Sequence, residues 1–138
     1  MAKLYYNCPG GAFGDCMPFG KDGVFYLYYL KDTRKPPEHR DPLDWQLVLT
    51  RDFVHYEDLG TAIPGGTPEE QDRSVISGSV VEGGGKYHAF YTGENLAFPA
   101  QGRPAQFQLH AVSEDLIHWT KTGPIEGVPT QPGYDPDD

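Results

Sequence analysis

GVFYLYY at residues 23–29 and GKYHAFY at residues 85–91 decide the fold of this chain. Each run begins at a glycine and continues with aromatic and aliphatic residues, the composition of a β-strand that is buried within a sheet. The second run follows the first at a spacing of 62 residues. A strand that recurs in the same form at a fixed spacing indicates an internal repeat.

A second pair of segments follows in the same order. TRDFVHY at residues 50–56 matches SEDLIHW at residues 113–119, at a spacing of 63 residues. The Asp of this pattern accepts hydrogen bonds from backbone N–H groups just after it, which is typical of a tight turn. Each unit is therefore predicted to contain about four antiparallel strands, the last two joined by this turn. A repeated four-stranded antiparallel unit is typical of a β-propeller blade.

Weaker signals complete the two units, and helical periodicity is almost absent. Further strands are expected at 46–50, 74–81 and 107–112 and around the two turns, with loops at 35–43, 64–72 and 98–104. We expect an all-β chain with repeat units at 12–63 and 74–126, and with 127–138 leading into a third unit. Propellers close with four to eight blades. The chain is thus expected to supply about two blades and the start of a third.

The composition disfavours several classes of function. Eleven Lys and Arg residues against twenty Asp and Glu residues give a formal net charge of −9, which disfavours binding to nucleic acid and to anionic membranes. No stretch approaches the roughly 20 apolar residues of a membrane-spanning helix. The first residues lack a signal-peptide pattern, so a cytoplasmic location is expected. Cys8 and Cys16 are expected to be reduced, and no cluster has metal-site spacing, so no metal or other cofactor is predicted.

In order and spacing, these segments resemble the N-terminal half of the five-bladed propeller of glycoside hydrolase family 32, the invertases, levanases and inulinases. Family 43 shares this architecture. The resemblance rests on FYLYY at 25–29, Trp45, the turn at 50–56, SGSVV at 77–81 and AFYTG at 89–93, and it continues through 108–121. It implies retaining hydrolysis of a fructoside-like or related carbohydrate substrate. Retention requires two carboxyl groups about 5–5.5 Å apart, a nucleophile and an acid/base.

Asp15 is the candidate catalytic nucleophile. The resemblance places the family's nucleophilic Asp on the innermost strand of the first blade, where this chain has GDCMPF at residues 14–19. Taken by itself, Asp15 beside Gly14 favours a turn or capping role. The repeat favours the catalytic interpretation, because innermost strands line the axis of a propeller. A carboxylate is costly to bury there unless it has a chemical role.

The chain departs from the family pattern at the expected sugar site. Gly14 and Cys16 replace the Asn and Pro that flank the family's Asp, and Leu30 stands where the family has a substrate-binding Gln. Invertase-type specificity is therefore not expected to carry over unchanged. The sequence stops at 134–138, where the resemblance would place an Arg-Asp-Pro segment, with the acid/base Glu further on. We therefore expect the chain alone to be inactive or nearly so.

Five further residues are candidates for contacting the sugar. Phe13 and Trp45 have rings that stack on sugars, although most aromatic residues of propeller strands pack between blades. Ser77 matches the candidate nucleophile at the spacing of 62 residues. It is expected to begin an innermost strand and to bind a sugar hydroxyl or cap a neighbouring strand. Ser79 and Glu94 complete the expected substrate-binding set.

A module from another class remains the alternative: a non-catalytic carbohydrate-binding or assembly domain built of propeller blades. Saturable glycan binding without hydrolysis would favour this alternative. In either case, two blades leave open strand edges and uncovered sheet faces, which invite pairing with another chain. We therefore expect self-association. The sequence leaves open which sugar is bound and which linkage is cleaved.

Overall fold

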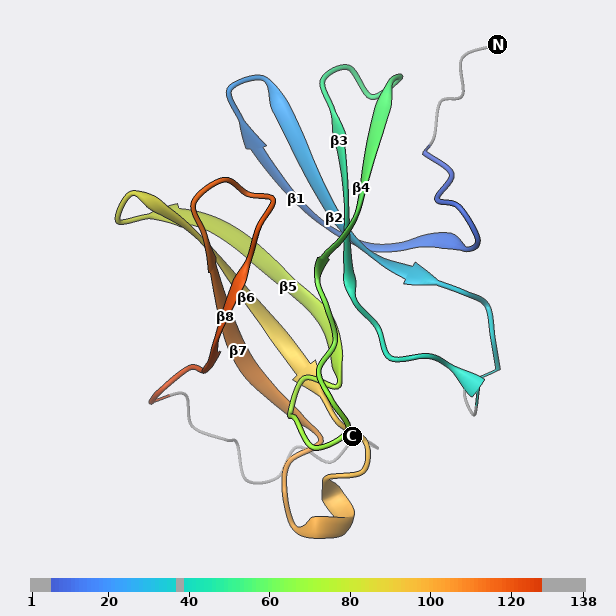
Figure 1. Ribbon diagram of the computed structural model, residues 1–138, viewed down its shortest axis with the longest axis vertical. Coiled ribbons are helices and arrows are strands. Elements are labelled where there is room, and N and C mark those ends of the chain that lie inside the picture. The colour runs from blue at the N-terminus through green and yellow to red at the C-terminus, as the bar shows by residue number, and fades with distance from the viewer. Residues whose placement is uncertain (1–5, 37–38, 128–138) are drawn as a thin grey trace, which may run out of the picture.

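The structure is a computed structural model that describes residues 6–36 and 39–127. Within these ranges, eight strands form two four-stranded sheets (Figure 1). The first sheet contains β1 (Ala12–Lys21), β2 (Val24–Asp32), β3 (Trp45–Thr50) and β4 (Tyr56–Ile63). The second contains β5 (Ser74–Gly83), β6 (Lys86–Glu94), β7 (Gln106–Ser113) and β8 (Thr120–Pro124). Apart from Gly127, the expected lead into a third blade at 127–138 lies outside the described residues.

Both sheets are simple antiparallel meanders, with strand orders β1-β2-β3-β4 and β5-β6-β7-β8. Tight turns with left-handed backbone angles join the first two strands of each sheet, at Asp22 and Gly23 in the first and at Gly84 and Gly85 in the second. Turns of this kind match the twist of paired strands. The predicted all-β class, with two antiparallel four-stranded blades, is confirmed.

The turn between the last two strands is built in the same way in both sheets. The hydroxyl oxygen of Thr50 accepts a hydrogen bond from the backbone N–H of Phe53 at 2.9 Å, and that of Ser113 accepts one from Leu116 at 2.9 Å. Phe53 and Leu116 have positive φ angles of 57° and 67°. The repeated sequence pattern therefore corresponds to a repeated local structure.

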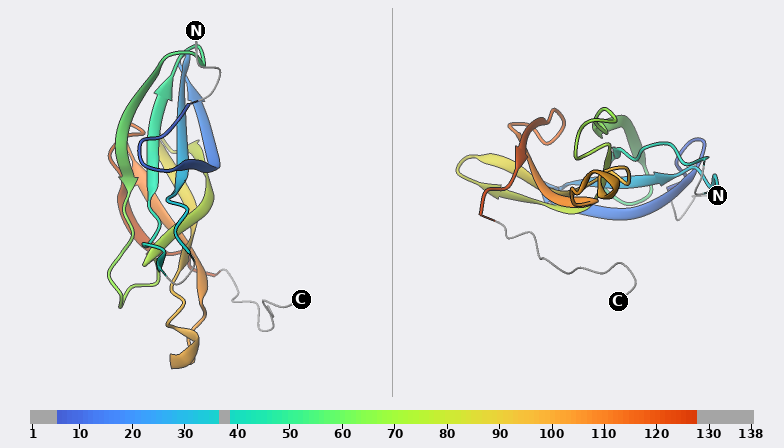
Figure 2. Two further views of the ribbon diagram at one scale, coloured as in Figure 1. Left: turned by 90° about the vertical axis from the view of Figure 1, so that its right-hand side faces the viewer. Right: turned by 90° about the horizontal axis from the view of Figure 1, so that it is seen from below.

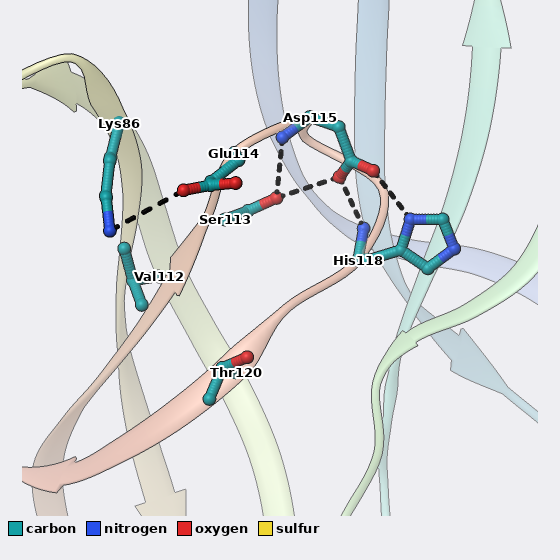
Figure 3. A pocket seen from close by; sticks show the side chains of 7 residues that line it. All are labelled: Lys86, Val112, Ser113, Glu114, Asp115, His118 and Thr120. Carbon is teal, nitrogen blue, oxygen red and sulfur yellow. Dashed lines mark hydrogen bonds and ion pairs between the residues drawn. The ribbon is translucent and has the colours of Figure 1, made fainter.

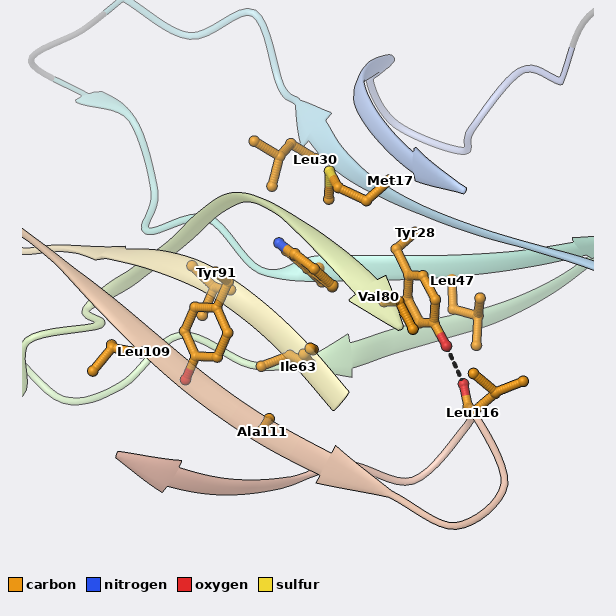
Figure 4. Packing of buried hydrophobic residues seen from close by; sticks show 13 residues of the cluster. Met17, Tyr28, Leu30, Leu47, Ile63, Val80, Tyr91, Leu109, Ala111 and Leu116 are labelled. Carbon is orange, nitrogen blue, oxygen red and sulfur yellow. Dashed lines mark hydrogen bonds between the residues drawn. The ribbon is translucent and has the colours of Figure 1, made fainter. Parts of the chain in front are cut away.

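The main apolar core lies between the two sheets (Figure 4). Alternation along each strand places one set of side chains in this core and the next set on the opposite face. The first sheet contributes Met17, Tyr28, Leu30, Trp45, Leu47 and Ile63, and the second contributes Val75, Val80, Ala89, Tyr91, Leu109, Ala111 and Leu116. The first strands of the two sheets, β1 and β5, also contact one another.

Two directed hydrogen bonds cross this core. The hydroxyl of Tyr28 donates to the backbone carbonyl of Leu116 in the β7–β8 turn (Figure 4). The indole Nε1 of Trp45 donates to the backbone carbonyl of Ile76 on β5 at 2.9 Å. Both donors are fully buried, and their rings lie 5.5 Å apart. These bonds give the packing of the two sheets a defined lateral register, which apolar contacts alone do not supply.

The opposite face of each sheet differs in how it is covered. On the first sheet, a smaller apolar cluster is formed by Cys8, Leu27, Tyr29 and Val48, with Tyr6, Phe13 and Tyr56 packed against it. On the second sheet, Val81 and Phe90 remain 44% and 37% exposed. The two units are therefore alike in backbone and unlike in their outward surfaces.

Long connections gather at the end of the sheets where β5 and β7 begin. The loop between β6 and β7, which contains the short 3₁₀ turn η2 (Pro99–Gln101), extends beyond the strands (Figure 2). The amide of Asn95 ties this loop to the connection between the sheets by donating to the carbonyls of Pro68 and Glu70 at 2.8 and 2.7 Å. The predicted loops at 64–72 and 98–104 thus pack together through a buried polar side chain.

Candidate active site

An irregularity interrupts the first strand of each sheet at equivalent places in the repeat. The pairing of β1 with β2 shifts between Phe13 and Cys16, and the pairing of β5 with β6 shifts at the matching position. Such bulges re-aim side chains and are common beside active sites. Asp15 lies within the first irregularity and Ser77 within the second. The fold therefore takes both side chains out of the regular alternation of their strands.

Glycine at position 78 is required by the close approach of β5 to β6. A Cβ atom at Gly78 would lie 2.7 Å from the backbone Cα of Tyr91, which is closer than real side chains allow. The backbone around Ser77 is therefore held tightly against its neighbour. The side chain of Ser77 therefore projects from a backbone whose position beside β6 is constrained.

The structure brings Asp15 and Ser77 together. The hydroxyl of Ser77 donates to Oδ2 of Asp15 at 2.7 Å, across the contact between β5 and β1. Both residues are exposed. In the described part of the chain, the other carboxylate oxygen of Asp15, Oδ1, has no hydrogen-bond partner. One oxygen is thus oriented by the protein while the other is free to face a ligand.

The other expected sugar contacts are spread over the molecule. Phe13 stacks on Tyr29 with ring centroids 4.3 Å apart, in the smaller apolar cluster. Ser79 is exposed and pairs with Phe90 on the second sheet. Glu94 is half-buried at the end of β6, where its carboxylate accepts a hydrogen bond from the side chain of Gln106 at 2.8 Å. None of these contacts joins them to Asp15.

Trp45 requires a correction. Its side chain has no exposed surface and belongs to the core between the sheets, so it cannot stack on a sugar in this arrangement. The reason is its place on the strand, because Trp45 pairs with Leu30 on the face that the second sheet covers. Leu30, the position at which the resemblance implies a polar substrate contact, is buried in the same core.

An open depression of about 340 Å³ lies near the β7–β8 turn, and Asp15 is not among the residues that line it (Figure 3). His118 Nδ1 lies 2.6 Å from Oδ2 of Asp115 in its wall, an arrangement that resembles an activated histidine. The first sheet has the same pair, with His55 Nδ1 at 2.7 Å from Oδ2 of Asp52. A geometry present in both units belongs to the turn rather than to a catalytic centre.

Hydrogen bonds in these turns lower the pKa values of Asp52 and Asp115 well below the usual value for an aspartate. For Asp52, the largest cause is the hydrogen bond from the side chain of His55, followed by backbone N–H groups of His55 and Val54. For Asp115, burial acts to raise the pKa, and the hydrogen bonds from His118 and its neighbours outweigh it. The ionised carboxylates therefore act as acceptors that hold the turns together.

A buried carboxylate that no sequence pattern indicates, that of Asp72, lies in the connection between the sheets. Asp72 accepts a hydrogen bond from the hydroxyl of Tyr91 at 3.0 Å and forms an ion pair with Lys121 at 2.6 Å. These contacts fasten the connection to β6 and β8. Asp72 lies in a loop segment without periodicity, so no local pattern distinguishes it from the acidic residues around it.

Among the described residues, no group of three or more His, Cys, Asp or Glu side chains is arranged to hold a metal ion. No helix in this part of the chain is long and apolar enough to cross a membrane. Cys8 and Cys16 are both free thiols, and desolvation raises the pKa of Cys16, which disfavours its nucleophilic thiolate form.

Comparison with known proteins decides the family. Residues 16–135 match the sequence pattern of the glycosyl hydrolases family 32 N-terminal domain. The chain belongs to glycoside hydrolase family 32. The matched residues begin immediately after Asp15, so family 32 membership rests on the blades and their turns rather than on the candidate nucleophile.

Individual relatives agree with membership of family 32. A sucrose-6-phosphate hydrolase from Zymomonas mobilis is 31% identical over 105 residues, which are 75% of this chain and 19% of that protein. Fructan 1-exohydrolase IIa from Cichorium intybus superposes with a TM-score of 0.67 at 22% identity, over 93% of this chain and 24% of its own. A β-fructofuranosidase from Bombyx mori gives a TM-score of 0.61 at 26% identity, over 91% of this chain and 25% of its own. The chain thus spans about a fifth to a quarter of these relatives.

Proposed function

We propose that this chain is the part of a retaining glycosidase that carries the nucleophile, and that Asp15 is that nucleophile. The observation that supports this most directly is the hydrogen bond from Ser77 to Oδ2 of Asp15, which joins equivalent positions of the two blades. A repeated fold provides equivalent positions, and here one of them carries a carboxylate while the other carries the hydroxyl that orients it. Family membership supplies the reaction class.

The proposed reaction has two steps. Oδ1 of Asp15 attacks the anomeric carbon while the glycosidic C–O bond breaks, and the departing oxygen takes a proton from a second carboxyl group. Water, deprotonated by the same second group, then displaces the sugar from Asp15 and restores the carboxylate. We assign the second carboxyl group to no residue of this chain, because the resemblance places it beyond the segments matched here. Activity is therefore proposed for the whole protein.

The proposed substrate is a fructoside or a related sugar. This is supported by relatives named as a sucrose-6-phosphate hydrolase, a fructan exohydrolase and a β-fructofuranosidase. Gly14 and Cys16 flank Asp15 with small side chains where the family pattern has Asn and Pro, and Leu30 is buried in the core. We therefore propose a preference that differs from that of invertases. Hydrolysis rates on sucrose, sucrose 6-phosphate, fructans and other furanosides test this directly.

The decisive experiment compares Asp15→Asn with Asp22→Asn in the whole protein. Asp15→Asn removes the attacking oxygen's charge and should lower kcat by more than about 10³-fold. Asp22→Asn is the matched control in the turn between β1 and β2, where a positive φ of 49° tolerates Asn. Hydrolysis that survives Asp15→Asn would overturn the assignment. Saturable glycan binding without hydrolysis by the unaltered protein would favour a binding module instead.

A further inference from the structure

A single chain of hydrogen bonds crosses the outer face of the second sheet. His88 Nε2 lies 3.0 Å from the backbone carbonyl oxygen of Gly83, and His88 Nδ1 lies 2.9 Å from His110 Nε2. The remaining nitrogen of this pair, His110 Nδ1, lies 2.6 Å from the hydroxyl oxygen of Thr122. These four residues come from β5, β6, β7 and β8 in turn. The chain therefore links all four strands.

Strand register explains how the groups meet. An irregularity in the pairing of β7 with β8 at His110 leaves Thr122 as an extra residue, and its hydroxyl also lies 3.1 Å from the backbone carbonyl of His110. The ring centroids of His88 and His110 lie 5.1 Å apart, and those of Phe90 and His110 lie 5.0 Å apart. Both imidazoles are thus held in place from several sides.

The partners determine where the protons sit. The carbonyl of Gly83 only accepts, so Nε2 of His88 must carry a hydrogen. A neutral His88 then accepts at Nδ1, which requires the hydrogen of His110 to be on Nε2. The one nitrogen left is Nδ1 of His110, opposite the hydroxyl of Thr122, which both donates and accepts.

We propose that His88 and His110 together form a site that binds one extra proton and no second. The extra proton binds at Nδ1 of His110 and is accepted by the hydroxyl oxygen of Thr122. That hydroxyl then turns its own hydrogen to the backbone carbonyl of His110. Every group in the chain keeps a partner. The outer face of the second sheet gains a single positive charge at low pH.

A second proton has no place in this geometry. It would have to occupy Nδ1 of His88, which faces the N–H of His110 at 2.9 Å. Two donors would then point at one another at hydrogen-bond distance, and two imidazolium charges would lie side by side. The second protonation therefore requires the hydrogen bond between the rings to break and the rings to separate.

The groups around His88 and His110 support a limit of one positive charge on the pair. Burial, and then the neighbouring charge of His88, lower the pKa of His110. The ring of Phe90, whose centroid lies 5.0 Å from that of His110, can stabilise one cation beside it. Strand alternation places these further groups on the same face: neutral Ser79 and Val81 from β5, Lys86 and Glu94 from β6, neutral Gln108 and Val112 from β7, and neutral Thr120 from β8. Lys86 pairs with Glu114 at 3.7 Å, and Glu94 accepts from Gln106.

The repeat shows that the pair is specific to this face. The residues at the matching positions of the first sheet are Tyr26 and Leu47, which pack in the core between the sheets. The strand geometry at these two positions is therefore compatible with residues other than histidine. Any layer that packs over this face meets a neutral surface at higher pH and a charged one at lower pH, so acid weakens an apolar contact at this place.

Nitrogen-15 NMR of the histidine rings during an acid titration of the chain tests the proposal. At pH values above those at which the pair binds its extra proton, both His88 and His110 should be neutral, with the ring hydrogen on Nε2. On acidification, the signals of His110 should change to the doubly protonated form while His88 stays neutral. Two rings that protonate independently, or His88 with its hydrogen on Nδ1, would overturn the proposal.

Three variants test whether His88 and His110 bind one proton as a pair or only hold the strands of the sheet together. His88→Asn keeps an acceptor for His110, so His110 should still bind one proton. Potentiometric titration of the double variant His88→Asn with His110→Gln should show one proton fewer than the unaltered chain, and a difference of two would contradict the proposal. Thr122→Val removes the oxygen that accepts the extra proton and should move the titration of His110 to lower pH. An unchanged midpoint in a folded Thr122→Val variant would also overturn it.

Discussion

Tyr28 and Phe90 occupy equivalent positions in the two units and differ by a single hydroxyl group. In the first sheet, that hydroxyl crosses the core to the carbonyl of Leu116. In the second sheet, Phe90 is 37% exposed and has no polar group to offer to a covering layer. The difference suggests that the bond from Tyr28 is specific to the joint between these two sheets, because the strand geometry itself does not require it.

Removal of the hydroxyl of Tyr28 should therefore destabilise the packing between the two sheets. Tyr28→Phe leaves the buried carbonyl of Leu116 without its donor, and we expect the free energy of unfolding to fall by about 1–3 kcal/mol. Chemical denaturation monitored by tryptophan fluorescence measures this, because Trp45 lies in the same core. Tyr26→Phe is the matched control, since the hydroxyl of Tyr26 makes no hydrogen bond in the described part of the chain. If both variants lower the free energy of unfolding equally, the hydrogen bond from Tyr28 to Leu116 has no specific stabilising role.

The β3–β4 and β7–β8 turns show how a short pattern specifies an element. In each turn, one carboxylate oxygen accepts two backbone N–H groups, at 2.9 and 2.8 Å for Asp52 and at 2.9 and 2.7 Å for Asp115. The Thr or Ser hydroxyl, the Asp and the His that build this arrangement all come from one short stretch of sequence. Local structure of this kind needs no contribution from the rest of the molecule.

These turns make stability depend on acid. The pKa of Asp52 and that of Asp115 lie below the ordinary value of 3.8 in the folded protein. The stabilisation is therefore complete above that value and is lost as the pH falls through the lower, folded pKa. Urea denaturation at a series of pH values should show a free energy of unfolding that decreases below about pH 4.

The variants Asp52→Asn and Asp115→Asn test this cause. The amide oxygen still accepts backbone hydrogen bonds, but it carries no charge and does not titrate in this range. Stability at neutral pH should fall modestly, and the loss on acidification should become shallower. A double variant with the same acid dependence as the unaltered chain would show that other carboxylates are responsible.

At the scale of the whole molecule, the two outward faces are unequal. The first sheet is covered by the smaller apolar cluster that includes Tyr6 and Cys8, whereas the second leaves Val81 and Phe90 exposed beside the histidine pair. Apolar side chains on a twisted sheet face favour association with another layer. The uncovered face of the second sheet is therefore the place at which we expect self-association.

Sedimentation velocity over a range of concentrations measures this association. The 138-residue chain should form larger species as its concentration rises, and Phe90→Ser should weaken their formation. Phe25→Ser is a matched control, because Phe25 is equally exposed at 37% but packs on Phe53 of the β3–β4 turn. A folded monomer at every concentration would contradict the expectation.

β1, which carries the candidate nucleophile Asp15, illustrates the limit of local signals. β1 contains Gly14, Pro18 and Gly20, which interrupt the alternation typical of a strand, so only the family resemblance located it. The structure shows that the interruption is a bulge, which aims Asp15 toward Ser77. The feature that obscures the strand in the sequence is thus the feature that builds the candidate site.

The sequence by itself determined the repeat, the strands other than β1 and the turns at Asp52 and Asp115, because strand composition and turn chemistry act over a few neighbouring residues. Only the tertiary structure decided that Trp45 is buried, that Ser77 orients Asp15, and that His88 meets His110. These outcomes depend on which face of a strand the next sheet covers and on the register of distant strands. Neither quantity is encoded in local spacing, since both follow from how whole sheets pack.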